Sequence, residues 1–247
     1  MSNNRPPQVP KVIGHRGAAG HAPENTVVAI ETAARLGARW VEFDVKLTRD
    51  GELILFHDDA LDRTTDGHGL VAETALADIR GLDAGKWYQA RFAGERVPTL
   101  IEALGALARL GLGANVEIKP CPGRERETGE ATARLLKAHW PSRLPAPVLS
   151  SFRPEALAAA QAAAPEFPRA FLIGNVPDDW RAKAEALGAT AIHCNQQLID
   201  HPRVLALKGA GYAVRCYTVN DARIAATLFA WGVDSVFTDY PDRILAV

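Results

Sequence analysis

The sequence predicts an α/β fold of the TIM (β/α)8 barrel type, with a small subdomain inserted after the second strand. Short apolar, β-branched runs alternate with helical segments along the chain, and this alternation is typical of parallel βαβ units. Eight such runs are present, and the length of 247 residues suits the roughly 250 residues usual for this barrel. A doubly wound parallel sheet is the competing architecture.

Each predicted strand is a short apolar run bounded by polar, glycine or proline residues. In chain order these strands are Lys11 to His15, Trp40 to Val45, Asn115 to Lys119, Pro147 to Ser151, Ala170 to Ile173, Ala191 to Cys194, Ala213 to Thr218 and Ser235 to Thr238. The helical segments carry apolar residues at helical spacing, and several end at a glycine, which is common where a helix stops. They are Asn25 to Leu36, Leu100 to Leu110, Glu125 to Trp140, Pro154 to Ala164, Asp179 to Leu187, Pro202 to Gly209 and Asp221 to Trp231.

One connection is much longer than a turn and a helix require. About fifty residues separate Val45 from Leu100, and Asp50-Gly51 near their start lies between alternating apolar runs, which is a hairpin signal. The rest is rich in glycine and aromatic residues. We therefore expect residues 46–98 to form a cap on the carboxyl-terminal face of a barrel that spans residues 10–247, because the loops on that face build active sites.

Composition excludes several classes of partner. Lys and Arg number 28 against 29 Asp and Glu, so the chain lacks the basic surplus of a general nucleic-acid binder. No apolar run approaches the ~20 residues that span a bilayer, and the opening MSNNRPPQVP lacks the apolar centre of a signal peptide. The three cysteines show no metal-ligand spacing. These features predict a cytosolic protein without stable membrane association; no motif indicates its oligomeric state.

The first predicted strand ends in Gly14-His15-Arg16-Gly17, a candidate site for an anion. The Arg16 guanidinium offers a fork of donors suited to phosphate or carboxylate, and the glycines allow close backbone approach. His15 alone would more often be a packed turn residue. Glu24, in the following Pro23-Glu24-Asn25, has two interpretations: a functional acid, or an acid at the start of a helix.

Carboxylates mark one face of two predicted strands. Glu42 and Asp44 are two residues apart, as are Glu117 and Lys119, so each pair shares a strand face. Acids crowded on one buried face repel each other unless a cation lies between them. Glu42, Asp44 and Glu117 therefore predict one divalent cation, Mg²⁺ or Ca²⁺, whereas zinc fits an all-oxygen set less well. A layer of structural ion pairs inside the barrel is the alternative.

A second histidine follows the predicted hairpin. If the turn centres on Asp50-Gly51, His57 folds back across from Phe43 and Asp44, over the predicted cation. Two imidazoles that flank a metal suit displacement at a phosphodiester, because one can accept a proton while the other protonates the leaving alcohol. We lean to His15 as base and His57 as acid.

Taken together, these residues resemble the glycerophosphodiester phosphodiesterase family, bacterial cytosolic type. The similarity lies in HRGAAGHAPENT, EFDVKLTRDGELILFHDD and NVEIKP, with further matches in LDRTTDGHG, VPTL, LSSF, IHCN, YTVN and FTDYP. It covers the chain after Pro10 and implies a TIM barrel that hydrolyses glycerophosphodiesters from deacylated phospholipids to sn-glycerol 3-phosphate. It further implies three groups of site residues: metal ligands Glu42, Asp44 and Glu117, a catalytic pair His15 and His57, and phosphate contacts Arg16 and Lys119.

Three further residues are candidate substrate contacts: Phe152, His193 and Tyr217, the last standing where many members carry tryptophan. The resemblance leaves open attack by a glycerol hydroxyl, through a cyclic intermediate, or by water. The headgroup is likewise open. Two other functions remain: a lipid-acting phosphodiesterase of phospholipase C or D type, which would need an apolar rim or basic face, and a non-catalytic glycerophosphodiester-binding protein, which would need no proton-transferring histidines.

Overall fold

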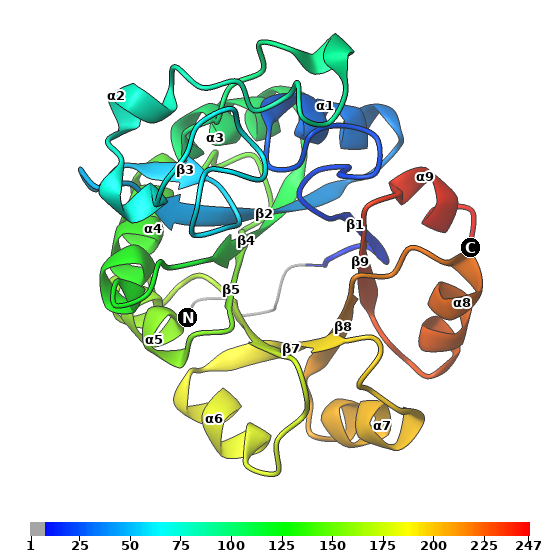
Figure 1. The fold of residues 1–247 in the computed structure, drawn as a ribbon. Helices are drawn as coiled ribbons and strands as arrows, with labels where there is room; N and C mark the ends of the chain where they lie inside the picture. The colour runs from blue at the N-terminus through cyan, green and yellow to red at the C-terminus, as the bar shows by residue number, and fades with distance from the viewer. Residues whose placement is uncertain (1–7) are drawn as a thin grey trace.

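The computed structural model describes residues 8–247 and contains a closed barrel of eight parallel strands surrounded by helices (Figure 1). The barrel strands are β1 (Val12–Gly14), β2 (Trp40–Leu47), β4 (Gly113–Ile118), β5 (Val148–Ser151), β6 (Arg169–Ile173), β7 (Ala189–Asn195), β8 (Ala213–Tyr217) and β9 (Ser235–Thr238). Neighbours pair in the order β1-β9-β8-β7-β6-β5-β4-β2, and Gly14 pairs with Val41 to close the ring. Closure excludes the doubly wound sheet and confirms the predicted TIM barrel.

The helices are α1 (Val27–Arg35), α3 (Leu100–Leu110), α4 (Glu125–His139), α5 (Pro154–Ala163), α6 (Trp180–Ala186), α7 (His201–Gly209), α8 (Ala222–Ala230) and α9 (Pro241–Ile244). The first seven match the predicted helices to within two residues at each end, whereas α9 was not predicted. α1 begins after Thr26, whose side chain accepts the backbone N–H of Ala29. Within residues 8–247 no helix is long and apolar enough to cross a membrane.

Apolar side chains fill the barrel on both faces of its strands, as parallel sheets require. Inside the barrel, a cluster that includes Ile13, Trp40 and Phe237 packs against small residues such as Ala170 and Ala191. Larger clusters pack between the strands and the outer helices. Polar side chains then line the barrel mouth at the carboxyl ends of the strands, which is where the predicted site residues lie.

The long connection after β2 begins as the predicted hairpin. β3 (Leu53–Leu55) runs antiparallel to β2, with Val45 opposite Leu55, and Gly51 takes a positive φ of 82° in the turn. The segment also holds η1 (Val71–Glu73), α2 (Leu76–Ile79) and η2 (Ala90–Phe92), and it packs around apolar residues of its own. Figure 1 shows it at one side of the barrel mouth, beside α1 and α3.

Residues 1–7 of the segment MSNNRPPQVP lie outside the described residues. The cysteines, Cys121, Cys194 and Cys216, are buried free thiols.

Candidate active site

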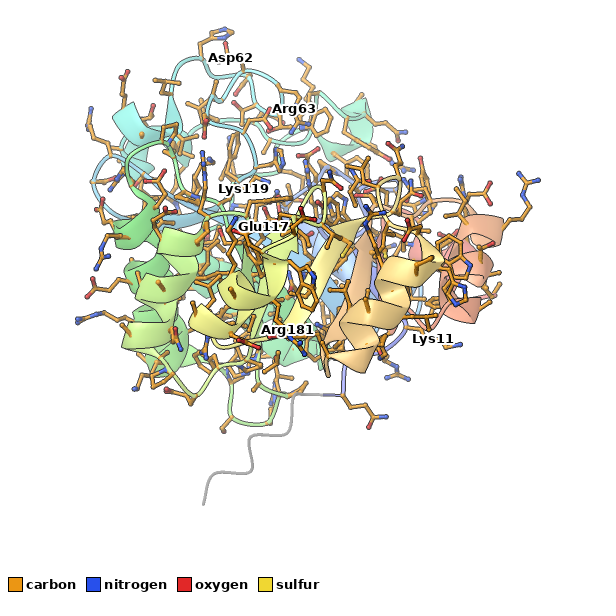
Figure 2. The ribbon with its side chains drawn as sticks, turned by 90° about the horizontal axis from the view of Figure 1, so that it is seen from below. Lys11, Asp62, Arg63, Glu117, Lys119 and Arg181 are labelled. Carbon is orange, nitrogen blue, oxygen red and sulfur yellow. The ribbon has the colours of Figure 1, made fainter. Side chains whose placement is uncertain are left out.

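The candidate site lies at the carboxyl ends of β1, β2 and β4, where the structure brings together every acid and base that the sequence predicts for catalysis. Glu42 and Asp44 come from β2 and Glu117 from β4, and Asp44 lies directly opposite Glu117 in the register of the two strands. Figure 2 shows Glu117 and Lys119 where the barrel meets the segment that carries Asp62 and Arg63. The period of two along a strand therefore places these acids on one inward face.

The three carboxylates form a tight, buried cluster. One oxygen from each of Glu42, Asp44 and Glu117 lies within 4.8 Å of the others, and the three residues are at most 8% exposed. Burial and the nearby charge of Asp44 raise the pKa of Glu42 to about 8 and also raise the pKa of Glu117. For Asp44, burial acts in the same direction, but Arg16 and Lys119 outweigh it and hold the pKa well below its ordinary value.

The donor set fits a hard divalent cation. Lys119 Nζ donates to Glu117 Oε1 at 2.8 Å, and Arg16 Nε lies 3.4 Å from Asp44 Oδ2. These ion pairs match part of the structural alternative, a layer of ion pairs. Among the described residues, however, no lysine or arginine side chain forms an ion pair with Glu42, and its buried Oε1 accepts no hydrogen bond. An orphaned carboxylate oxygen facing two others is the ligand arrangement that Mg²⁺ or Ca²⁺ uses.

His15 follows β1 and is oriented by an acid that sequence analysis did not single out. Its Nδ1 lies 2.7 Å from Asp239 Oδ1, and its Nε2 lies 4.0 Å from Glu42 Oε2. Asn220 donates to the other oxygen of Asp239 at 2.7 Å and so fixes that carboxylate. Burial lowers the pKa of His15, but the hydrogen bond to Asp239 and the charge of Glu42 raise it overall.

The HRG turn and the PENT segment bind the two acids of β2, Glu42 and Asp44. Arg16 has a φ of 49°, and its backbone N–H donates to Glu42 Oε2 at 2.8 Å. Asn25, with a φ of 56°, donates from Nδ2 to Asp44 Oδ2 at 2.8 Å and accepts the backbone N–H of Asp44 at 3.1 Å. The sequence indicated only a helix start at Asn25, because nothing local shows that its amide contacts β2.

His57 reaches the same cavity from the hairpin and has an acid of its own. Its Nδ1 lies 2.6 Å from Asp58 Oδ1, and burial lowers its pKa despite the nearby charge of Asp44. Arg63 binds both oxygens of Asp58 and both oxygens of Glu24. Glu24 also accepts from Arg16 at 2.6 Å. Glu24 therefore precedes α1, as the helix-start interpretation predicts, and it links Arg16 to Arg63.

The residues predicted to contact substrate also line the mouth of the barrel. A cavity of about 260 Å³ is bounded by His15, Arg16, Glu42, His57, Asn115, Glu117, Lys119, Ser150, Phe152, Leu172, His193, Tyr217, Thr218 and Phe237. Phe152 and Tyr217 meet edge to face, with ring centroids 5.8 Å apart. His193 is fully buried, with Nε2 3.2 Å from Arg215 and Nδ1 without a hydrogen-bond partner.

Fold and site together define a TIM-barrel protein whose mouth carries an acidic centre between two histidines. Residues 15–243 match the Glycerophosphoryl diester phosphodiesterase family. The chain belongs to this phosphodiesterase family.

Similar proteins cover nearly the whole chain. A phosphodiesterase from Oleispira antarctica, solved in complex with the product sn-glycerol-3-phosphate, is 43% identical, with a TM-score of 0.94 and 96% of each chain covered. YhdW of Bacillus subtilis is 34% identical over 242 residues, 95% of this chain and 96% of the relative. A glycerophosphodiester phosphodiesterase of the same organism is 33% identical over 249 residues, 93% of this chain and 83% of the relative.

Proposed function

We propose that the protein hydrolyses glycerophosphodiesters to sn-glycerol 3-phosphate and an alcohol, with a divalent cation and the His15–His57 pair. The observation that carries this proposal is that both histidines line one cavity of about 260 Å³ together with Glu42 and Glu117. Arg16 and Lys119 line the same cavity and would contact the phosphate group of the substrate. The Oleispira antarctica structure, which holds sn-glycerol-3-phosphate, supports this substrate class.

A divalent cation held by Glu42, Asp44 and Glu117 would supply a Lewis acid that offsets negative charge on a phosphate oxygen. The chain itself supplies the proton transfers. One imidazole takes a proton from the attacking oxygen, which belongs to water or to a glycerol hydroxyl, a new P–O bond forms, and the other imidazole gives a proton to the alcohol as its P–O bond breaks. Attack by water gives sn-glycerol 3-phosphate directly. Attack by the glycerol hydroxyl gives a cyclic diester, and water then adds to its phosphorus and breaks the ring P–O bond to the glycerol hydroxyl, which regains a proton.

We assign His15 as the base and His57 as the acid from their positions. His15 lines the cavity beside Glu42, whereas His57 also borders a second cavity outside it, where an alcohol can leave. Without a cation, the charge of Glu42 is one of the interactions that raise the pKa of His15. A cation bound to Glu42 would offset that charge and favour the neutral imidazole that a base requires.

The glycerol end of the substrate would occupy the inner part of the cavity. His193 Nδ1 and Asn115 Oδ1 are buried there without hydrogen-bond partners, so they can meet the glycerol hydroxyls at no cost in lost protein contacts. Phe152 and Tyr217 would form an aromatic wall nearer the mouth. We propose that the enzyme acts in the cytosol on such water-soluble diesters and requires no membrane or nucleic acid.

The test is incubation of the purified protein with glycerophosphocholine, with Mg²⁺ or Ca²⁺ and with EDTA, while sn-glycerol 3-phosphate is measured. We expect release that EDTA abolishes and that either His15→Ala or His57→Ala lowers by ~10²-fold or more. His139→Ala, on α4 away from the cavity, should retain full activity. Tight binding without release would instead identify a binding protein, and activity only on intact phospholipid a lipid-acting enzyme.

The roles of the two histidines can be separated with a 4-nitrophenyl ester of glycerol 3-phosphate. 4-Nitrophenolate leaves without protonation, so loss of the acid matters less with this substrate than with glycerophosphocholine. We expect the activity of His57→Ala to recover toward wild type, whereas that of His15→Ala stays low. Recovery of His15→Ala alone would reverse the assignment.

A further inference from the structure

A second cavity adjoins the candidate active site on the side of His57. It measures about 330 Å³ and is lined by Lys46, His57, Asp58, Asp59, Glu117, Ile118, Lys119, Pro120, Ser151, Phe152 and Arg153. Four of these residues, His57, Glu117, Lys119 and Phe152, also line the first cavity. A diester whose phosphate lies at this shared wall therefore places its two substituents in different cavities.

The carboxylates of the second cavity already have cationic partners. Asp59 accepts Lys46 Nζ at 2.6 Å, and Asp58 accepts Arg63 Nε at 2.6 Å. Glu117 accepts Lys119 Nζ at 2.8 Å. A positively charged headgroup would thus have to compete with protein cations for every acid in the cavity.

Arg153 is the exception among the charged lining residues. It is exposed, and within the described part of the chain no carboxylate lies within ion-pair distance of its guanidinium. Its hydrogen bonds are made by the backbone: the N–H donates to Ser151 Oγ at 3.1 Å, and the C=O accepts from Ala156 and Leu157 in α5. The side chain thus offers the fixed fork of donors that binds a carboxylate or phosphate.

The aromatic lining does not favour a quaternary ammonium group either. Phe152 contributes the one benzene ring among the described lining residues. The ammonium group of Lys119 lies 5.6 Å from its centroid. Recognition of a choline-type headgroup relies on open aromatic faces, and here a lysine already occupies one.

We propose that the second cavity receives the leaving alcohol and that Arg153 makes it select headgroups that carry an anionic group, such as the carboxylate of serine. This inference rests on the proposed phosphodiesterase function, and it assigns Arg153 as a specificity residue for the departing half of the substrate. Arg153 lies outside the first cavity, so it has no part in binding the glycerol end.

Glycerophosphoserine and glycerophosphoethanolamine provide a sharp comparison, because their headgroups differ by one carboxylate. For the wild-type enzyme we expect a higher kcat/KM with glycerophosphoserine than with glycerophosphoethanolamine or glycerophosphocholine. Arg153→Gln should lower the ratio of kcat/KM between the first two substrates by about three- to tenfold. Because Arg153 is exposed, raising the salt concentration should shrink the same ratio.

A matched control is Arg39→Gln. Arg39 is also an exposed arginine, but it precedes β2 at the amino end of the strand, away from both cavities, so its substitution should leave the ratio unchanged. If Arg153→Gln leaves the ratio at the wild-type value while all three diesters are hydrolysed, the specificity proposal is wrong and the phosphodiesterase function stands. Hydrolysis of none of the three would refute both.

Discussion

Asn25 provides the most direct test of how the site is held together. β1 ends at Gly14, opposite Val41 of β2, and β3 pairs with β2 only from Val45 onward, so Asp44 lies between these two partner strands. The N–H of Asp44 donates to the Asn25 side chain, while its C=O accepts the backbone N–H of Phe56, the residue that follows β3. The Asn25 side-chain oxygen thus accepts the backbone N–H of Asp44, which no neighbouring strand pairs with at this point, and its Nδ2 also donates to the Asp44 carboxylate at 2.8 Å.

Asn25→Ala removes both contacts and adds strain. Loss of the hydrogen bond to a charged carboxylate and an unsatisfied buried N–H each cost about 1 to 3 kcal/mol. Alanine in the left-handed region, where Asn25 has a φ of 56°, costs about 1 kcal/mol more. We therefore expect the free energy of unfolding to fall by about 3 to 7 kcal/mol, a large share of the stability of an ordinary domain.

Urea unfolding in EDTA, followed by tryptophan fluorescence, measures this change without any contribution from a bound cation. Asn25→Gly is the matched control, because it loses the same amide but tolerates the positive φ, and it should be about 1 kcal/mol more stable than Asn25→Ala. If Asn25→Ala unfolds within 1 kcal/mol of the wild type, the Asn25 amide does not contribute to holding β2 in place.

Three further predictions follow from buried charges. Saturating Mg²⁺ or Ca²⁺ should raise the Tm of the wild type by about 5 to 10 °C but leave Asp44→Asn nearly unaffected; equal shifts would place the ion elsewhere. Arg169→Lys should lower stability in urea by about 2 kcal/mol, because the Arg169 guanidinium donates to the backbone oxygens of four residues, including Leu187. For Glu24, burial raises the pKa, but Arg63 and Arg16 lower it overall. The charged form therefore stabilises the fold above pH 4.5 and this contribution is lost as the pH falls, so the Tm values of Glu24→Gln and wild type should converge in acid.

Much of the framework was predictable because local patterns carry it. The eight barrel strands appear as eight apolar runs, and their order around the ring follows from the βαβ alternation. The shared inward face of Glu42 and Asp44 follows from the period of a strand, and the hairpin follows from Asp50-Gly51. The strand ends were less accurate: β2 continues to Leu47, because its pairing with β3 extends the ladder beyond the barrel.

The supporting residues were not predictable in this way. Asp239 lies 224 residues from His15, and Arg63 lies 39 residues from Glu24. Neither contact leaves a local pattern, since an acid after a strand or an arginine in a loop is an ordinary solvated residue in most sequences. Asn25 looked like part of a helix start and in fact binds Asp44.

The sequence by itself determined the barrel, the acidic face and the two histidines, because periodicity and turn chemistry act over a few neighbouring residues. Only the tertiary structure decided which groups hold these side chains in place and that a second cavity lies beside the first. Closure of the barrel brings the chain's first strand against its last and so places Asp239 beside His15, whereas the second cavity lies where the carboxyl ends of β2, β4 and β5 meet. The energy of a buried charge depends on what surrounds it in space, and a linear sequence does not specify those surroundings.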